Sequence, residues 1–384
     1  VKIVPAVDLW IDGELHIGQI KQVKIEDLLE RAPIVLDNPV LKSSLKGKVV
    51  FITGAAGSIG SEIARQVASC NAKKFVLIDQ AESPLYELQQ EFVQNGALNF
   101  VAEVADIRDE NRMQQLFSTY KPHFVFHAAA YKHVPLMEEN PYEAIRVNVC
   151  GTKRLADLAL LHKVAKFVMV STDKAVNPTN VMGATKRVAE MYISCLANSG
   201  KTKFITTRFG NVLGSNGSVI PLFKKQIESG GPISVTHKDI TRFFMTIPEA
   251  CQLVLEAGIM GSGGEIYVFD MGESVKIYDV AIKMIQLSGL KYPEDIDIKI
   301  SGLRPGEKLY EELLANDENT LPTYHDKIMI AKVAELNTEQ IKQQIEGICC
   351  ASNQVSNLEL VSQIKKLVPE YISNNSVYEK LDKN

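Results

Sequence analysis

The sequence predicts an α/β protein whose main part is a doubly wound parallel sheet. Short β-branched runs alternate with helix-length amphipathic segments from residue 48 to residue 211, and a glycine-rich turn separates the first run from the first helix. Helices of this length between strands imply right-handed crossovers, which make neighbouring strands parallel. From residue 212 the alternation is lost, so we expect a smaller, interleaved mixed α/β part on the C-terminal side.

The expected elements follow one another in a regular order. The strands are 48–53, 75–78, 100–104, 124–127, 167–170 and 203–207, and the helices are 61–69, 84–95, 110–120, 139–161 and one from about residue 181. The smaller part has strands at 233–236 and 243–246 and helices at 219–228 and 248–258. Two amphipathic helices are expected in the tail from residue 335.

The composition is that of a globular cytoplasmic protein. With 384 residues, of which 46% are hydrophobic and 23% charged, the chain can bury a sizeable core. A net charge of −4 without a long basic block gives no reason to expect a nucleic-acid partner. The six cysteines show no CxxC spacing and no histidine cluster, so we expect reduced thiols and no metal site. No run is long enough to span a bilayer, but the chain begins at Val1, so a membrane anchor in a longer native protein stays open.

The glycine-rich turn predicts a dinucleotide cofactor. Gly54, Gly57 and Gly60 follow a strand directly and open a helix. Glycines let the backbone approach a pyrophosphate, and the free N–H groups at the helix start face its negative charge. Asp79 ends the next strand, where a carboxylate suits the hydroxyls of an unphosphorylated ribose, which favours NAD over NADP. A tight turn without a ligand, and an Asp79 that only caps the following turn, are the alternatives.

A second candidate site follows the strand 167–170. Thr172, Asp173 and Lys174 come just after this strand. Ligands of open parallel sheets bind outside the carboxyl ends of the strands, so a hydroxyl, a carboxylate and an amine here occupy the usual position of an active site. The next helix carries Met182 and Lys186 on one face, four residues apart. A solvent-exposed loop without a catalytic role is the alternative.

These motifs together resemble the extended short-chain dehydrogenase/reductases. The Asp173–Lys174 pair, with RFGN at 208–211 and RPGEK at 304–308, resembles the nucleotide-sugar 4,6-dehydratases of bacterial polysaccharide biosynthesis, the CapD-like group that acts on UDP-N-acetylglucosamine. The likeness covers residues 40 to 335. Met182 stands where the usual active-site tyrosine would be, which is similar to the methionine-bearing branch of the group. Because a thioether has no acidic proton, Met182 cannot be the general base.

The resemblance implies a Rossmann fold, tightly bound NAD, a UDP-sugar substrate and a homo-oligomer. It divides the chain into the remnant of a preceding domain with a linker (1–47), an NAD-binding domain (48–211), a substrate-binding part (212–334) and a helical tail (335–384). Larger members of the group carry an amino-terminal membrane region, which would bring a full-length protein to the cytoplasmic face of the inner membrane.

The resemblance also implies a reaction in which the sugar is oxidised at C4, loses water across C5 and C6, and is reduced at C6. Lys174 is the expected base at C5 and Asp173 the acid at the C6 hydroxyl, each with its pKa moved toward neutrality. Thr172 is expected at the C4 oxygen and Lys186 at the nicotinamide ribose. Whether Thr172, a water or Lys174 accepts the proton of the C4 hydroxyl stays open.

The full set of expected site residues has three groups. The catalytic group is Thr172, Asp173, Lys174, Met182 and Lys186. The cofactor-binding group is Gly54, Ala56, Gly57, Ser58, Ile59, Gly60, Asp79, Ser83, Asp106, Ile107, Ala128, Ala129, Ala130, Asn148, Lys186 and Phe209, where Asn148 has hydrogen bonding to nearby main chain as an alternative role. The substrate-binding group is Lys132, Asn211, Arg242, Arg304 and Glu307.

Three other functions stay open. A nucleotide-sugar 4-epimerase has the same fold and cofactor but needs no acid at C6, so the Asp173–Lys174 pair argues against it. A simple NAD-dependent oxidoreductase would release NADH, and the missing tyrosine argues against that. A catalytically inactive, NAD-sensing binding module would account for Met182.

Overall fold

A computed structural model describes residues 2–3, 21–22, 39–197, 199–314, 319–332, 337–351 and 355–382. Nine strands form its central sheet: β3 (Val49–Thr53), β4 (Lys74–Asp79), β5 (Phe100–Val104), β6 (Phe124–His127), β7 (Lys166–Val170), β8 (Lys203–Arg208), β13 (Ile266–Phe269), β16 (Asn319–Pro322) and β17 (Ile328–Lys332). Most of the residues before the strand β3, and so most of the segment 1–47, lie outside the described ranges.

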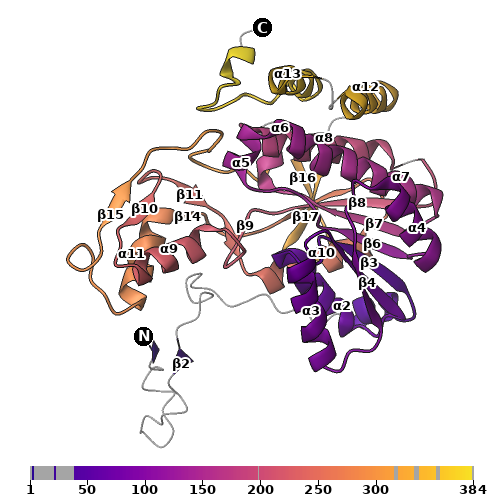
Figure 1. Ribbon diagram of the computed structural model, residues 1–384, viewed down its shortest axis with the longest axis horizontal. Helices are drawn as coiled ribbons and strands as arrows, with labels where there is room; N and C mark the ends of the chain where they lie inside the picture. The colour runs from indigo at the N-terminus through magenta and orange to yellow at the C-terminus, as the bar shows by residue number, and fades with distance from the viewer. Residues whose placement is uncertain are drawn as a thin grey trace, which may run out of the picture.

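The strand order is β16-β17-β13-β8-β7-β6-β3-β4-β5 (Figure 1). Neighbouring strands from β5 to β13 are parallel, whereas β17 is antiparallel to both β13 and β16. The order runs from β3 to β5 in one direction and from β6 to β8 in the other, so the winding reverses between β3 and β6. The predicted doubly wound α/β class is confirmed, and the reversal marks the edge where such folds bind ligands.

Helices cover both faces of the sheet because successive strand residues point to opposite sides. Phe51 packs into the core under one layer, while its neighbours Val50 and Ile52 pack under the other. The first layer contains α4 (Glu110–Tyr120), α7 (Thr152–Leu161) and α8 (Val181–Cys195). The second contains α1 (Pro39–Leu45), α2 (Ser58–Ala68), α3 (Glu82–Gln94) and α10 (Ile247–Met260).

The long helix expected at 139–161 is present from Pro141 to Leu161, so its start lies two residues later than expected. It runs without a break through α6 (Pro141–Ala144), the π-helix η4 (Ile145–Gly151) and α7, and the separate helix α5 (Val134–Glu139) precedes it. Pro141 lacks the N–H that would continue the hydrogen bonding of α5, so a new helix begins at that residue. The π-helical turn that follows contains Asn148, and such turns are frequent at functional sites.

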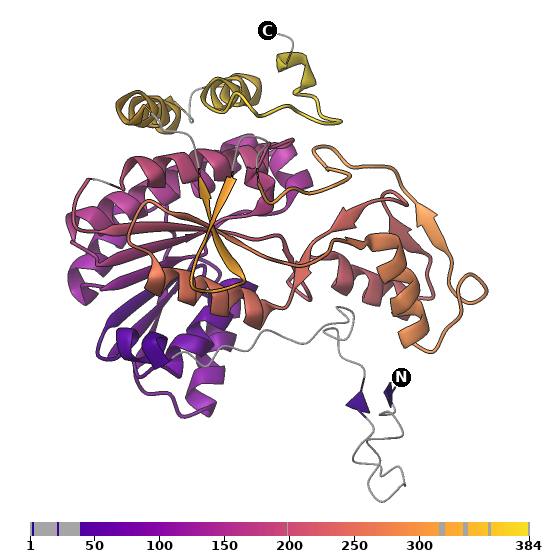
Figure 2. The ribbon, with the colours of Figure 1, turned by 180° about the vertical axis from the view of Figure 1, so that it is seen from behind.

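The smaller part lies beside the carboxyl edge of the sheet (Figures 1 and 2). It contains α9 (Val219–Glu228), β10 (Ile233–Val235), α11 (Ile277–Leu287) and β15 (Ile298–Ile300), which enclose a core of their own. Two short pairs join it to the sheet: β9 (Asn211–Val212) with β12 (Phe244–Met245), and β11 (Thr241–Arg242) with β14 (Val275–Lys276). Because β13, β16 and β17 also follow residue 212, the chain passes between the two parts more than once.

The tail forms α12 (Thr338–Ala351) and α13 (Asn357–Leu367), which pack on the α8 side of the sheet. A disulfide joins Cys150 of η4 to Cys349 of α12. The expectation that all cysteines are reduced is therefore wrong for this pair; the sequence spacing does not show that η4 and α12 meet. In the described part of the chain, no helix is long and apolar enough to cross a bilayer.

Candidate active site

The carboxyl ends of β7 and β8 bring the central residues together. After β7, Thr172 caps a single 3₁₀ turn, η5 (Asp173–Ala175), by accepting a hydrogen bond from the main-chain N–H of Lys174. The N–H of Asp173 donates to the carbonyl of Phe209 just beyond β8, at 3.1 Å. This bond fixes the start of the turn against the neighbouring strand, and the side chains of Asp173 and Lys174 leave it together.

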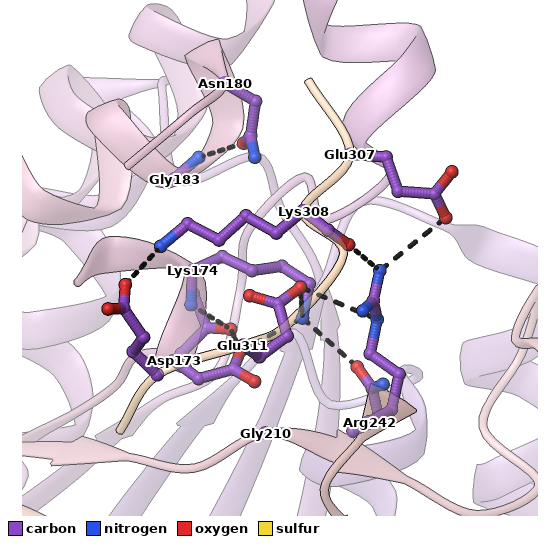
Figure 3. Close-up of polar contacts among 12 residues, drawn as sticks. Asp173, Lys174, Asn180, Gly183, Gly210, Arg242, Glu307, Lys308 and Glu311 are labelled. Carbon is purple, nitrogen blue, oxygen red and sulfur yellow. Dashed lines mark hydrogen bonds and ion pairs between the residues drawn. The ribbon is translucent and has the colours of Figure 1, made fainter. Parts of the chain in front are cut away.

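Asp173 and the partly buried Lys174, whose side chain is 18% exposed, form an ion pair (Figure 3). Asp173 Oδ1 accepts hydrogen bonds from Lys174 Nζ at 3.0 Å and from Thr172 Oγ1 at 2.8 Å, and Asp173 is fully buried. Its other oxygen, Oδ2, is buried and has no hydrogen-bond partner among the described residues. A Cβ on Gly210 would lie 2.8 Å from Oδ2, so the missing side chain leaves room at that oxygen.

A second segment, from Arg304 to Glu311, closes the other side of the pair. Glu311 Oε1 lies 3.4 Å from Lys174 Nζ and 3.6 Å from Arg242 Nε, so this carboxylate stands between two cations (Figure 3). Asn211 Oδ1 accepts from Lys174 Nζ at 3.2 Å. Glu311 is not among the site residues expected from the sequence, where it is one of two adjacent glutamates after RPGEK.

The charge of Lys174 differs from expectation. Burial alone would lower the pKa of Lys174, but the negative charges of Asp173 and Glu311 outweigh that effect and the pKa is raised. The expectation of a pKa moved toward neutrality is therefore wrong for Lys174. An opposite charge within a few ångströms favours the charged form, and here two carboxylates provide it.

The helix α8 places Lys186 against the carboxyl end of β7 and Met182 in the hydrophobic core. Lys186 Nζ donates to the carbonyl of Val170 at 2.7 Å, and burial lowers its pKa to about 8. Met182 is 2% exposed and belongs to the hydrophobic core on this face of the sheet. The start of α8 lies against the catalytic turn, because a Cβ on Gly183 would be 2.1 Å from the carbonyl oxygen of Lys174.

A cavity of about 150 Å³ lies where the sheet winding reverses. It is lined by Gly54, Gly57, Ile78, Asp79, Gln80, Ala105, Asp106, Ile107, Ala128, Ala129, Ala130, Tyr131 and Val147. Eight of the expected cofactor residues are thus gathered around one space. Tyr131, which directly follows the alanine run 128–130, and Val147 also line the cavity but were not expected from the sequence.

The backbone of the glycine turn is tightly fitted around this cavity. Gly54 has a φ of +67°, and a Cβ there would lie 2.6 Å from the main-chain N of Ala129. A Cβ on Gly60 would lie 2.0 Å from the carbonyl oxygen of Gly54. Asp79 accepts hydrogen bonds from the N–H groups of Ala56 and Ala81, both at 2.9 Å, so it also caps the following turn, as the alternative proposed.

Other expected cofactor residues do not line the cavity. Both ends of the Asn148 amide hydrogen-bond to the main chain of Tyr131, and its nitrogen also donates to Thr185 of α8. This is the main-chain role considered for Asn148 as an alternative. Ser83 donates to Glu82 at the start of α3, and Phe209 stacks on Phe269 in the core. The remaining expected residues, Ser58, Ile59, Gly60 and Lys186, lie in α2 and α8.

The expected substrate residues fall into two groups. Asn211, Arg242 and Glu307 lie around Lys174 and Glu311, with Glu307 3.6 Å from Arg242. Arg304 is farther out, with a side chain 57% exposed and an ion pair to Glu307 at 3.1 Å. Lys132 donates to Ser215 at 3.4 Å, and burial, with a contribution from the charge of Lys174, lowers its pKa. No group of three or more metal-ligating side chains is found in the described ranges.

Residues 50–333, which include the cavity and the charged cluster, match the sequence model of a family described as polysaccharide biosynthesis protein. The chain belongs to this family. The match confirms the resemblance to the CapD-like group and covers every expected site residue. The tail helices and the segment after them lie outside the matched region of this polysaccharide biosynthesis protein.

Relatives of this chain are named as a capsular polysaccharide biosynthesis protein, as a UDP-N-acetylglucosamine 4,6-dehydratase and as a UDP-glucose 4-epimerase. The capsular polysaccharide biosynthesis protein CapD of Staphylococcus aureus is 52% identical over 348 residues, or 90% of this chain and 58% of CapD. The inverting UDP-N-acetylglucosamine 4,6-dehydratase of Campylobacter jejuni is 34% identical over 72% of this chain and 80% of its own. The UDP-glucose 4-epimerase of Rickettsia rickettsii is 35% identical over 71% and 79%. This chain therefore spans little more than half of the length of CapD.

Proposed function

We propose that this chain is a nucleotide-sugar 4,6-dehydratase that acts on UDP-N-acetylglucosamine and retains NAD through each turnover, in bacterial capsule, O-antigen or related glycan biosynthesis. The observation that carries the proposal is the Asp173–Lys174 pair, with Nζ 3.0 Å from Oδ1. Elimination of water needs a base at C5 and an acid at the C6 hydroxyl. The dehydratase and epimerase relatives have nearly equal identity, so the relatives do not favour either activity. The Asp173–Lys174 pair supports the dehydratase, because a 4-epimerase needs no acid at C6.

The pair can reach its reactive state without a net change of charge. The raised pKa of Lys174 makes it cationic, and moving one proton from Nζ to the Asp173 carboxylate gives a neutral amine and a neutral acid together. The amine then takes the C5 proton, and the protonated Asp173 gives its proton to the departing C6 hydroxyl. Asp173 Oδ2 suits that role because it is buried, unpartnered in the described structure and beside the space left by Gly210.

Thr172 and Lys186 act on the oxidation step. The Thr172 hydroxyl donates to Asp173 Oδ1 at 2.8 Å, so it connects the expected position of the C4 oxygen with the carboxylate. Lys186 is held by the Val170 carbonyl, with a pKa of about 8, where it offers a hydrogen bond to the nicotinamide ribose. Met182, buried in the core, contributes no proton.

The cavity at the glycine turn fits the adenosine and pyrophosphate of a dinucleotide. Gly54 and Gly57 leave backbone exposed to it, and Asp79 and Asp106 provide carboxylates along it. We assign Asp79 to the ribose hydroxyls, which favours NAD because a 2′-phosphate would meet this negative charge. A nicotinamide whose ribose is held by Lys186 would supply the hydride acceptor and donor of the reaction.

The test is the mass of the product that forms from UDP-N-acetylglucosamine without added NAD. A dehydratase gives a product lighter by one water, whereas an epimerase gives an isomer of unchanged mass, and an oxidoreductase gives NADH. A protein that holds NAD but changes neither sugar nor cofactor is the binding module. The Asp173→Asn variant should lose water elimination while it retains NAD.

Asp239→Asn provides a matched control, because Asp239 is an exposed aspartate of the smaller part with a side chain 55% exposed. It should eliminate water at the wild-type rate. If Asp173→Asn did the same, the acid would have to be another group and the proposal for Asp173 would fail.

A further inference from the structure

The residues after the last long helix contact both sides of the proposed site. We call residues 371–378 the C-terminal segment; they follow α13 and have no regular secondary structure. This segment lies outside the region that matches the family. Figure 1 shows the chain after α13 returning toward the side of the sheet where the smaller part lies.

The first set of contacts is with the loop between the catalytic turn and α8. The main-chain N–H of Ile372 donates to the carbonyl of Pro178, and that of Asn374 donates to the carbonyl of Thr179, both at 3.1 Å. Asn180, the next residue, caps α8 by accepting from Gly183 N at 2.7 Å. The C-terminal segment thus lies alongside the loop that connects Lys174 to the start of α8.

The second set of contacts is with the loop that leads to Glu311. The N–H of Gly306 donates to the carbonyl of Asn374 at 2.7 Å, and Asn374 Nδ2 donates to the carbonyl of Glu307 at 2.9 Å. One step on, Asn375 Nδ2 donates to the carbonyl of Leu303 at 2.8 Å. Main-chain groups on both sides of the Glu307 side chain are therefore held by this segment.

A third set of contacts reaches the first turn of α8 through a buried carboxylate. Glu138 is 6% exposed, and its Oε2 accepts from Ser376 Oγ at 2.6 Å while its Oε1 accepts from Val181 N, also at 2.6 Å. The hydroxyl of Tyr378 donates to the carbonyl of Glu138 at 3.2 Å. Glu138 has no part in the proposed reaction, and these bonds explain how a carboxylate is accommodated at this depth.

We propose that the C-terminal segment reinforces the docking of the substrate loop 304–308 on the loop that follows the Asp173–Lys174 turn, and that Asn374 is its central positioning residue. The two loops also bond directly, since Thr179 Oγ1 and Asn180 Nδ2 both donate to the carbonyl of Gly306 at 3.0 Å. Asn374 is bonded to both loops, to Thr179 on one side and to Gly306 and Glu307 on the other. The proposal rests on the proposed function, because it takes Glu307 and Arg242 as contacts of the nucleotide sugar. Asn374 itself touches no reacting atom; it acts through the loops.

Asn374→Ala removes the bond to Glu307 and leaves the main-chain bonds in place. Loss of one such bond should lower kcat/KM for UDP-N-acetylglucosamine by about fivefold to tenfold, chiefly through KM. The NAD content should be unchanged, because Asn374 does not line the cofactor cavity. Asn374→Asp has the same shape without the donor and should lose at least as much. Val377→Ala, at a side chain of the same segment that is 73% exposed, is the matched control and should behave as wild type.

Unchanged kcat/KM in both Asn374 variants would overturn the proposal. A parallel loss of NAD would also overturn it, because it would indicate a general structural defect.

If wild type binds UDP-N-acetylglucosamine in calorimetry without eliminating water, the proposed function fails. The ratio of affinities between wild type and Asn374→Ala then tests the role of the C-terminal segment. If wild type does not bind the sugar either, amide hydrogen exchange decides. Faster exchange at 303–308 in Asn374→Ala supports the positioning role, and unaltered exchange overturns it.

Discussion

Lys174 Nζ lies 3.4 Å from Glu311 Oε1, although the two residues belong to segments far apart in the sequence. Glu311 is 8% exposed, and its second carboxylate oxygen has no hydrogen-bond partner among the described residues. Asp173 and Glu311 together raise the pKa of Lys174 above its ordinary value. The resting site therefore holds Lys174 in the form that cannot abstract a proton.

Glu311→Gln should lower the pKa of Lys174, because it removes one of the two anions that stabilise the ammonium form. In the pH profile of kcat/KM, which reports the groups of the free enzyme, the basic limb should move to lower pH, because the reactive form keeps one proton on the Asp173–Lys174 pair and this limb reports its loss from Lys174. Glu312→Gln is the control, since Glu312 pairs with Lys308 at 2.9 Å and is 44% exposed. A basic limb that stays in place, or moves to higher pH, would contradict this role of Glu311.

Gly183→Ala should destabilise the protein and disturb the catalytic turn. In an open helix, alanine in place of glycine stabilises by about 1 kcal/mol, but a Cβ here would lie 2.1 Å from the carbonyl oxygen of Lys174. Overpacking of this kind costs about 1–3 kcal/mol, so the net change in unfolding free energy should be unfavourable. Denaturant unfolding and turnover are the measurements.

Gly347→Ala is the matched control for Gly183→Ala, because Gly347 lies in α12 with nothing within 4 Å of the added Cβ. It should stabilise by about 0.5–1 kcal/mol. Equal effects at the two positions would show that α8 does not press on the catalytic turn.

The sequence predicted the strands of the sheet well because their patterns are local. β5 and β6 begin and end where the β-branched runs do; β3, β7 and β8 differ from expectation by one residue at one end, and β4 by one residue at each end. The helix α2 begins three residues before the expected start, because Gly60 enters the helix, where only a glycine fits against Gly54. The helix expected from Glu139 begins instead at Pro141, and its π-helical stretch η4 could not be predicted because the helical periodicity continues on both sides of it.

Only those site residues could be predicted whose positions follow directly from the order of strands along the chain. Thr172, Asp173 and Lys174 follow a strand, so their place at the sheet edge could be inferred. Glu311 could not be inferred, since it reaches Lys174 only after the chain has passed through the smaller part. Sequence also does not tell which glutamate after RPGEK points inward: Glu311 is buried and Glu312 is exposed, although they are neighbours.

Gly54→Ala should abolish retention of NAD. The added Cβ would lie 2.6 Å from Ala129 N, so the turn and the alanine run that line the cavity must move apart. Gly47→Ala is the control: its φ of +74° gives the same backbone strain, about 1–2 kcal/mol, but nothing lies within 4 Å of its Cβ. Absorbance and mass of the cofactor released from each purified variant provide the measurement. NAD retained by Gly54→Ala would place the cofactor elsewhere.

His127 should make stability depend on pH below neutrality. It is buried at the end of β6 between Thr53 and Thr152, at 2.8 and 2.9 Å, and burial lowers its pKa from 6.5 to about 3. Between these two values only the unfolded chain takes the proton, so stability falls as the pH falls from 6.5 toward 3. At pH 5 the loss is about 2 kcal/mol, from about 1.5 pH units at 1.36 kcal/mol each.

His127→Asn should remove this part of the pH dependence, so its unfolding free energy should fall less than that of wild type between pH 7 and pH 5. Denaturant unfolding at the two pH values measures the difference. Equal slopes in both proteins would show that His127 takes a proton in the folded chain as readily as in the unfolded one.

The disulfide between Cys150 and Cys349 should tie the tail to the cofactor domain. Alkylation of the unreduced, denatured protein should label four cysteines, Cys70, Cys195, Cys251 and Cys350, and reduction should add two. Cys349→Ser should lower the unfolding free energy by about 2–4 kcal/mol, because the bond closes a long loop in the unfolded chain. Cys350→Ser, at the exposed neighbour, should leave it unchanged. Six labelled cysteines before reduction would mean that η4 and α12 are held by packing alone, and Cys349→Ser should then match Cys350→Ser.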